Sequence, residues 1–98
     1  MHSQELVASI QNVGTQIRSQ GVVELHIYGS VARDEHTGDS DLDVFVTLDP
    51  DTRFSLINLS TVALLLEDVT GLKVDITTRD ALNQRLSQQI EAEAIRVV

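Results

Sequence analysis

The sequence of residues 22–48 is VVELHIYGSVARDEHTGDSDLDVFVTL, in which two apolar segments flank a polar loop. Apolar and polar residues alternate over 22–28 and again over 41–48, with the two-residue period of a β-strand. Between them, residues 29–40 are rich in Gly, Asp, Ser and Thr, which predicts a loop with one turn of helix at 30–34. Because this connection is too short for a full helical crossover, the two strands should pair antiparallel.

Helices are predicted before and after this pair of strands. Apolar residues recur every three or four positions over residues 3–19, which is the spacing of a helix with one buried side. A second helix, capped by Asp51 or Thr52, should extend to about residue 68, and Gly71 should follow it as a left-handed cap residue.

A third strand is predicted over residues 72–77, and a last helix, capped by Thr78, should run from about residue 79 into the nineties. The helix between the second and third strands is long enough for a right-handed parallel crossover. We therefore expect an α/β (α+β) fold with a mixed three-stranded sheet in the order 1-2-3 and about four covering helices. The apolar residues through which the last helix should pack are Leu82, Leu86 and Ile90.

The composition excludes several classes of protein. The chain has 98 residues, the size of one domain, and with no cysteine it has neither a disulfide framework nor a thiolate metal site. No apolar run is long enough to cross a bilayer and no signal peptide is visible, so we expect a cytoplasmic protein without a membrane partner. The net charge of −8 repels phosphate backbones and only three aromatic residues could stack on bases, which disfavours nucleic-acid binding.

Three aspartates on two of the predicted strands form a candidate metal site. Asp41 and Asp43 are two residues apart, so their carboxylates point to the same side, roughly 7 Å apart at Cα. Asp75 should project away from the core side of the third strand and lie beside them if the second and third strands pair. Hard oxygen ligands suit Mg²⁺, and two such ions roughly 3.5 to 4 Å apart would stabilise both the attacking and the leaving oxygen of a phosphoryl displacement. The alternative is that these aspartates are solvent-facing strand residues without a ligand.

The loop before these aspartates has the features of a phosphate-binding segment. Gly29 followed by Ser30 lets the backbone approach a phosphate closely, and the N–H groups of a short helix starting at Ser30 would point at the anion. Arg33, one turn later, would reach the same phosphates. A Gly-Ser pair after a strand is by itself an ordinary turn, and its combination with the aspartates makes the pattern specific.

The segment Gly29-Ser30-Val31-Ala32-Arg33, followed by Ser40-Asp41-Leu42-Asp43-Val44, resembles the signature of the DNA-polymerase-beta-type nucleotidyltransferase superfamily. The whole chain resembles the minimal nucleotidyltransferase (MNT) family, small proteins encoded beside HEPN-domain partners in prokaryotic toxin–antitoxin pairs. This resemblance implies a polymerase-beta-like nucleotidyltransferase fold over a single domain, residues 1–98. It also implies transfer of a nucleoside monophosphate from an NTP to an acceptor hydroxyl, with release of pyrophosphate.

The resemblance also implies roles for the site residues. The aspartate pair of the second strand would bind both metal ions, and Asp75 would bind the catalytic metal and help to deprotonate the acceptor. Gly29 and Ser30 would hold the triphosphate, and Arg33 matches the family's loop arginine. Asp34 stands where many relatives have glycine, which leaves the loop conformation open but removes no ligand.

The expected function is that of a Mg²⁺-dependent adenylyltransferase that transfers AMP from ATP to a protein hydroxyl on a HEPN-type toxin. The protein would thereby act as the antitoxin of this partner, and the two could form a hetero-oligomer. Antibiotic nucleotidyltransferases share the motif, but they add a further domain to hold the small molecule, for which these 98 residues leave no material. Two alternatives stay open. One is a binding antitoxin that neutralises its partner by occlusion without catalysis, and the other is a nucleotidyltransferase that acts on a small molecule together with a partner subunit.

Overall fold

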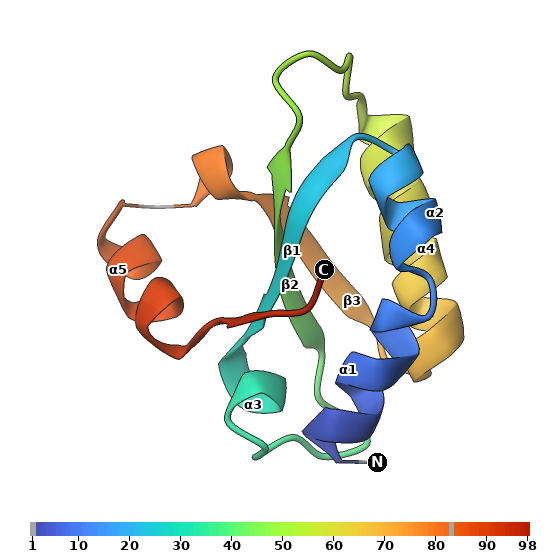
Figure 1. Ribbon diagram of the computed structural model, residues 1–98. Coiled ribbons are helices and arrows are strands. Elements are labelled where there is room, and N and C mark those ends of the chain that lie inside the picture. Colours follow the sequence, from blue (N-terminus) through green and yellow to red (C-terminus); the bar gives the residue numbers. More distant parts are fainter. Residues whose placement is uncertain (1, 83) are drawn as a thin grey trace.

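A mixed four-stranded sheet runs through the centre of the molecule (Figure 1). The computed structural model describes residues 2–82 and 84–98, without the side chains of residues 84–87. The strands are β1 Val22–Tyr28, β2 Leu42–Leu48, β3 Val74–Thr78 and β4 Ile95–Arg96. Their order is β3-β2-β1-β4, with β1 antiparallel to both β2 and β4, and β2 parallel to β3. The predicted fold class, the 1-2-3 neighbour relations and both strand directions are confirmed, whereas the predicted count of three strands is wrong.

Helices cover both sides of this sheet (Figure 1). Within the described residues they are α1 Ser3–Gln11, α2 Gly14–Ser19, α3 Gly29–Ala32, α4 Leu56–Thr70, the 3₁₀ helix η1 Arg79–Ala81, and α5 Gln84–Glu93. Helices α1, α2 and α4 lie on one side of the sheet and α5 on the other, while α3 lies at the end of β1. None of the helices in this described part of the chain is long and apolar enough to cross a membrane.

The predicted N-terminal helix over 3–19 is in fact two helices, α1 and α2, separated at Asn12 and Val13. The backbone of Val13 leaves the helical region, at φ −107° and ψ 16°. The next residue, Gly14, is buried, and a Cβ at this position would lie 3.8 Å from the Val98 side chain. The break thus coincides with a residue of low helix propensity that allows the backbone to approach the C-terminal segment closely.

The helix α4 begins later than predicted, because its cap is Ser55 rather than Asp51 or Thr52. The Ser55 hydroxyl accepts a hydrogen bond from the backbone N–H of Asn58, whose side chain in turn accepts from the Ser55 N–H, and this reciprocal pair is a capping box. Asp51 instead belongs to the preceding turn, where its N–H donates to the Asp49 carboxylate at 2.9 Å. The predicted left-handed cap at Gly71 is confirmed, with φ 72°.

The C-terminal segment departs most from the sequence-based expectation. Instead of one helix from residue 79, the chain forms η1, then α5, and then the short strand β4. The Thr78 hydroxyl accepts from the Ala81 N–H and so caps η1, not an α-helix. Backbone hydrogen bonds between Leu25 and the last residues, Leu25 N–H to Val98 O at 3.1 Å and Val97 N–H to Leu25 O at 2.8 Å, extend the pairing of β4 with β1.

The main core lies between the sheet and the helices α1, α2 and α4. Strand alternation places Phe45 on the side of β2 opposite the core residues Val44 and Val46, yet its side chain is also 0% exposed. It is covered there because the His26 ring stacks on it, with centroids 4.8 Å apart, and the Arg79 guanidinium lies 5.1 Å from its ring centroid. The buried members of the main core are Leu6, Ile10, Ile17, Val22, Leu25, Ile27, Val31, Leu42, Val44, Val46, Val62, Leu66, Val97 and Val98.

Candidate functional site

The strand register brings two of the three predicted aspartates side by side. Asp43 of β2 is the direct pairing partner of Asp75 in β3, and on its other side it pairs with Tyr28 at the end of β1. The third aspartate, Asp41, lies just before β2 and is exposed. Asp75 was expected beside both Asp41 and Asp43, and the strand register places it directly opposite Asp43.

These carboxylates lie close enough to perturb one another. Burial, followed by the charges of Asp75 and Asp41, raises the pKa of Asp43 above its usual value, and the opposing effect of Arg33 is smaller. Burial, with the same Asp43 and Asp75 charges, also raises the pKa of Tyr28. A half-buried carboxylate surrounded by like charges is costly to ionise, so this end of the sheet would gain from a bound cation.

No group of three or more His, Asp or Glu side chains is already gathered as a metal site within residues 2–82 and 88–98. Mg²⁺ does not require such a group, because it is commonly held by one or two carboxylates together with substrate phosphates and retained water. The hard oxygen donors of Asp43 and Asp75, and the repulsion between their like charges, fit a Mg²⁺ ion whose remaining ligands come from a nucleotide.

The predicted phosphate-binding loop forms the short helix α3, which begins directly after β1. Gly29, its first residue, has a φ of 74° and lies against the Asp43 side chain. A Cβ at this position would overlap Asp43 Oδ2 and lie 3.3 Å from Cγ. Glycine is therefore required by both its left-handed backbone and its contact with the candidate metal ligand. Ser30 follows Gly29 within the same short helix and Arg33 is its C-cap residue, so the three predicted phosphate-binding residues share one turn, of which Gly29 lies against Asp43.

A residue that sequence reasoning missed, Glu93, lies at the end of α5 and contacts this loop. Its Oε1 accepts a hydrogen bond from the Gly29 N–H at 3.2 Å, and its Oε2 accepts from Arg33 at 2.9 Å. Arg33 also donates to Glu35 at 3.0 Å, and the two hydrogen-bonded carboxylates raise the pKa of Arg33. One signal was present in the sequence: Glu93 follows Ile90 by three positions, so a helix turns it to the same side as its apolar residues.

The residue after this arginine, Asp34, has the left-handed backbone that glycine would adopt, with φ 58°. Aspartate tolerates this region better than most residues. The Asp34 carboxylate also accepts hydrogen bonds from the N–H and the hydroxyl of Ser3, at 3.2 and 2.9 Å. These two bonds lower the pKa of Asp34 and join the loop to the start of α1.

We expect Asp34→Ala to lower the melting temperature more than Asp34→Gly. Both variants lose the hydrogen bonds to Ser3, but only alanine has a Cβ that is strained in this left-handed backbone conformation. The pKa of Asp34 is lowered in the folded state. The ionised Asp34 carboxylate therefore stabilises the fold at pH values above the ordinary pKa of aspartate, and this stabilisation is lost as the pH falls below it. Thermal melts from neutral pH to pH 3 check both points. Equal melting temperatures for the two variants would contradict the strain argument.

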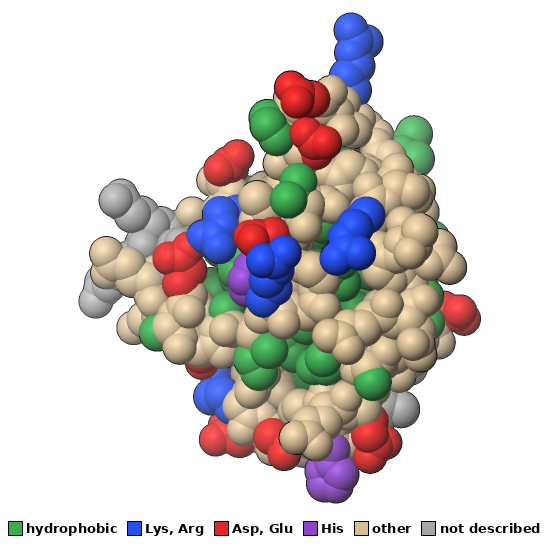
Figure 2. Space-filling view, viewed as in Figure 1, with side chains coloured by type: hydrophobic (Ala, Val, Ile, Leu, Met, Phe, Trp, Pro, Cys, Tyr) green, Lys and Arg blue, Asp and Glu red, His purple; other side chains and the backbone are tan. Residues whose placement is uncertain are grey.

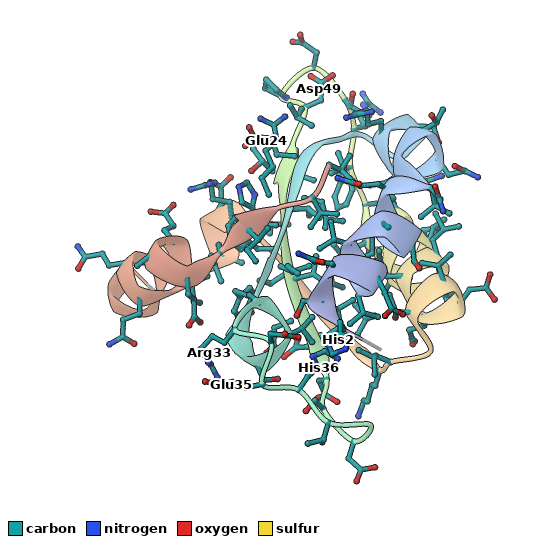
Figure 3. All side chains as sticks on the ribbon, turned by 60° about the horizontal axis from the view of Figure 1, so that its bottom comes forward. His2, Glu24, Arg33, Glu35, His36 and Asp49 are labelled. Carbon is teal, nitrogen blue, oxygen red and sulfur yellow. The ribbon has the colours of Figure 1, made fainter. Side chains whose placement is uncertain are left out.

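The surroundings of the site are acidic. Figure 2 shows red side chains along the lower edge of the molecule, where the loop after α3 lies in Figure 1. Figure 3 places Arg33 and Glu35 together at α3, on the side of the loop that faces α5. An anion that approaches the α3 loop therefore meets Arg33 already paired with two carboxylates, those of Glu35 and Glu93.

Comparisons with known proteins agree with this geometry. The nucleotidyltransferase domain family model matches residues 11–97. A Methanocaldococcus jannaschii protein, named as a candidate protein adenylyltransferase, is 34% identical over 77 residues, or 78% of this chain and 77% of that protein. A solved structure of a candidate minimal nucleotidyltransferase is 35% identical, with a TM-score of 0.83 over 97% of this chain and 95% of that chain.

A more distant neighbour shares the fold alone. It occurs in the structure of a tri-AMPylated Shewanella oneidensis HEPN toxin in complex with its MNT antitoxin, at 16% identity and a TM-score of 0.63, over 94% of this chain and 71% of that chain. The family match, by contrast, includes the α3 loop and all three aspartates. The chain therefore belongs to the nucleotidyltransferase domain family, as a member of its minimal nucleotidyltransferase group.

Proposed function

We propose that this protein is a Mg²⁺-dependent adenylyltransferase that transfers AMP from ATP to a hydroxyl group on a HEPN-type toxin, and thereby acts as an antitoxin. Residues 1–98 would form one nucleotidyltransferase domain. The observation that carries the proposal is the pairing of Asp43 with Asp75 directly against the glycine of the α3 loop. ATP as the substrate implies a cytoplasmic site of action.

Asp41, Asp43 and Asp75 are the residues that would hold the metal, with two Mg²⁺ ions expected. When bound, such ions stabilise the attacking and leaving oxygens of a phosphoryl displacement. The charge of the site supports a need for cations, because its carboxylates would otherwise repel the triphosphate.

The α3 loop would bind the triphosphate. Gly29 presents a backbone N–H without a side chain that would block a phosphate, and Ser30 adds a hydroxyl. Arg33 supplies a guanidinium at the other end of the same turn. Its planar fork of N–H donors is suited to phosphate oxygens.

Asp75 would act on the acceptor. It is exposed, so a hydroxyl group from outside can reach its carboxylate. By accepting the hydroxyl proton, Asp75 would help the oxygen to attack the α-phosphorus, form the new O–P bond and release pyrophosphate. Tyr28, which shares the Asp43 register position on β1, lines the same end of the sheet.

A protein acceptor is supported by the related proteins. The M. jannaschii relative is named as a protein adenylyltransferase candidate, and the S. oneidensis complex contains an AMPylated HEPN toxin. This chain's net charge of −8 would favour a partner with a basic face. The contact with the partner could outlast the transfer and form a hetero-oligomer.

The test is intact-mass measurement of a HEPN-type partner after incubation with catalytic amounts of this protein, ATP and Mg²⁺. We expect one or more mass gains, each of one AMP residue, and partner inactivation that persists after this protein is removed. Replacing ATP with the other NTPs defines the base preference, and EDTA provides the metal-free control.

The occlusion alternative predicts the opposite pattern. Inhibition would then need one molecule of this protein per partner site, would be indifferent to ATP, and would reverse on dissociation. An unmodified partner that is nevertheless inhibited in this way would overturn the adenylyltransferase proposal.

A further inference from the structure

The C-terminal end of α5 reaches into the loop that the proposed function assigns to the triphosphate. Glu93, the last residue of α5, has a side chain only 30% exposed. Its two carboxylate oxygens are divided between the Gly29 N–H, at 3.2 Å, and the Arg33 guanidinium, at 2.9 Å. The two donors are sixty or more residues away in sequence, so this contact depends on the position of α5.

A carboxylate and a phosphate compete for donors of this kind. Both are anions that accept hydrogen bonds from backbone N–H groups and from arginine, often through two oxygens at once. Glu93 therefore uses the same backbone N–H and the same guanidinium that a bound triphosphate would use. Its charge also acts on Asp43, whose pKa it helps to raise after the larger effects of burial, Asp75 and Asp41.

The helix that carries Glu93 does not belong to the layer of helices that covers the main core. In Figure 1, α5 lies on the side of the sheet opposite α1, α2 and α4, and its described part contacts α3 and β1 among other elements. A second ion pair, from Glu91 to Arg79, ties the same turn of α5 to η1. A movement that withdraws Glu93 from the loop would leave the main core intact, since that core lies on the other side of the sheet.

We propose that Glu93 is an internal competitor for the triphosphate site: it occupies Gly29 and Arg33 until a nucleotide displaces it, and its release frees the end of α5. This inference rests on the proposed function, because it takes the α3 loop to be the triphosphate site. It adds a coupling between nucleotide binding and the position of α5. The apparent affinity for nucleotide is then reduced by the fraction of molecules in which the contact is closed.

The test compares nucleotide affinity in Glu93→Gln and Glu93→Ala with a matched control, Glu91→Gln. Glu91 lies on the same turn of α5 and also pairs with an arginine, but with Arg79 rather than the loop. Isothermal titration with Mg²⁺–ATP, and with inorganic tripolyphosphate as a probe without a base, gives the dissociation constants. We expect Glu93→Gln to bind both about fivefold to tenfold more tightly, and Glu93→Ala at least as tightly as Glu93→Gln. Glu91→Gln should stay within about twofold of the unchanged protein, because its pair does not involve the phosphate donors.

A second readout follows the helix itself. Hydrogen exchange over residues 88–94 should become faster when tripolyphosphate is added to the unchanged protein, and should already be fast without ligand in Glu93→Ala. Thermal melts of each variant establish that it is folded before its affinity is compared.

Three outcomes would overturn the inference. If both Glu93 variants bind ATP no more tightly than Glu91→Gln while AMP transfer persists, the competitor role is wrong and the adenylyltransferase proposal stands. If they bind more weakly, Glu93 assists the nucleotide instead of competing with it. If neither the unchanged protein nor any folded variant binds ATP or tripolyphosphate, the proposed function fails as well.

Discussion

Asp43→Asn should abolish AMP transfer while leaving the fold intact, with a loss in rate of more than about 100-fold. Mutation of a group that merely supports a metal ligand typically lowers metal affinity or activity by about 10-fold to 100-fold, so loss of the charge of a ligand itself should lower activity further. Asn keeps the shape of the side chain but removes the charge that faces Asp75 across the strand pair. Rates of partner AMPylation, measured at saturating Mg²⁺ and ATP, check this expectation.

The same variant should be more stable than the unchanged protein when metal is absent. Burial and the charges of Asp75 and Asp41 raise the pKa of Asp43, which means that its ionised form opposes folding at neutral pH. Asn removes this repulsion, and we expect a melting temperature up to a few degrees higher in EDTA. Mg²⁺ with ATP should then stabilise the unchanged protein but not Asp43→Asn.

The matched control is Asp39→Asn, because Asp39 is an exposed residue of the neighbouring loop. This variant should change neither the transfer rate nor the melting temperature. Full transfer activity in Asp43→Asn would refute the assignment.

The neighbouring positions of Asp43 and Asp75 could be predicted because two local rules determine them. Strand alternation sets the direction in which each side chain points, and a helical crossover makes β2 and β3 parallel. These rules place Asp75 on the same side of the sheet as Asp41 and Asp43, but they do not decide which of the two lies opposite Asp75, because that depends on the register of the two strands. The short helix after β1 could be predicted for the same reason, since it depends on a few consecutive residues.

The features that sequence reasoning missed depend on contacts between distant residues. The strand β4 has only two residues, and its pairing with β1 is supported by backbone hydrogen bonds between Leu25 and the last two residues of the chain. Two residues are too few to show the alternation of apolar and polar side chains from which a strand is predicted. The position of Glu93 likewise follows from where α5 lies in the fold, and its spacing from Ile90 shows only which side of the helix it occupies.

The start of α4 was predicted wrongly for a different reason. Asp51, Thr52 and Ser55 are all residue types that cap helices. The deciding feature is Asn58, three residues after Ser55, which completes a reciprocal pair of hydrogen bonds. The earlier candidates are used in the turn after β2, where the Thr52 N–H donates to the Asp49 carbonyl at 3.1 Å.

Gly29→Ala should reduce AMP transfer nearly as much as loss of the metal ligand does, although the glycine carries no reactive group. Two effects combine at this position. A Cβ would overlap Asp43 Oδ2, so the carboxylate must leave its position beside Asp75, and the backbone φ of 74° is unfavourable for any residue with a Cβ. The left-handed conformation alone costs about 1–2 kcal/mol. We therefore expect a lower melting temperature together with a rate loss of about 100-fold, because small displacements of catalytic groups have effects of this size.

Gly71→Ala separates the two effects. Gly71 has nearly the same backbone, with φ 72°, but nothing lies within 4 Å of the position that a Cβ would take. Its alanine variant should therefore show the loss of stability without the loss of transfer, because a Cβ at this position meets no neighbouring atom and displaces no metal ligand. Calorimetric titration with Mg²⁺–ATP should show weaker binding for Gly29→Ala alone. Similar transfer rates for the two variants would show that contact between the glycine and Asp43 does not limit the reaction.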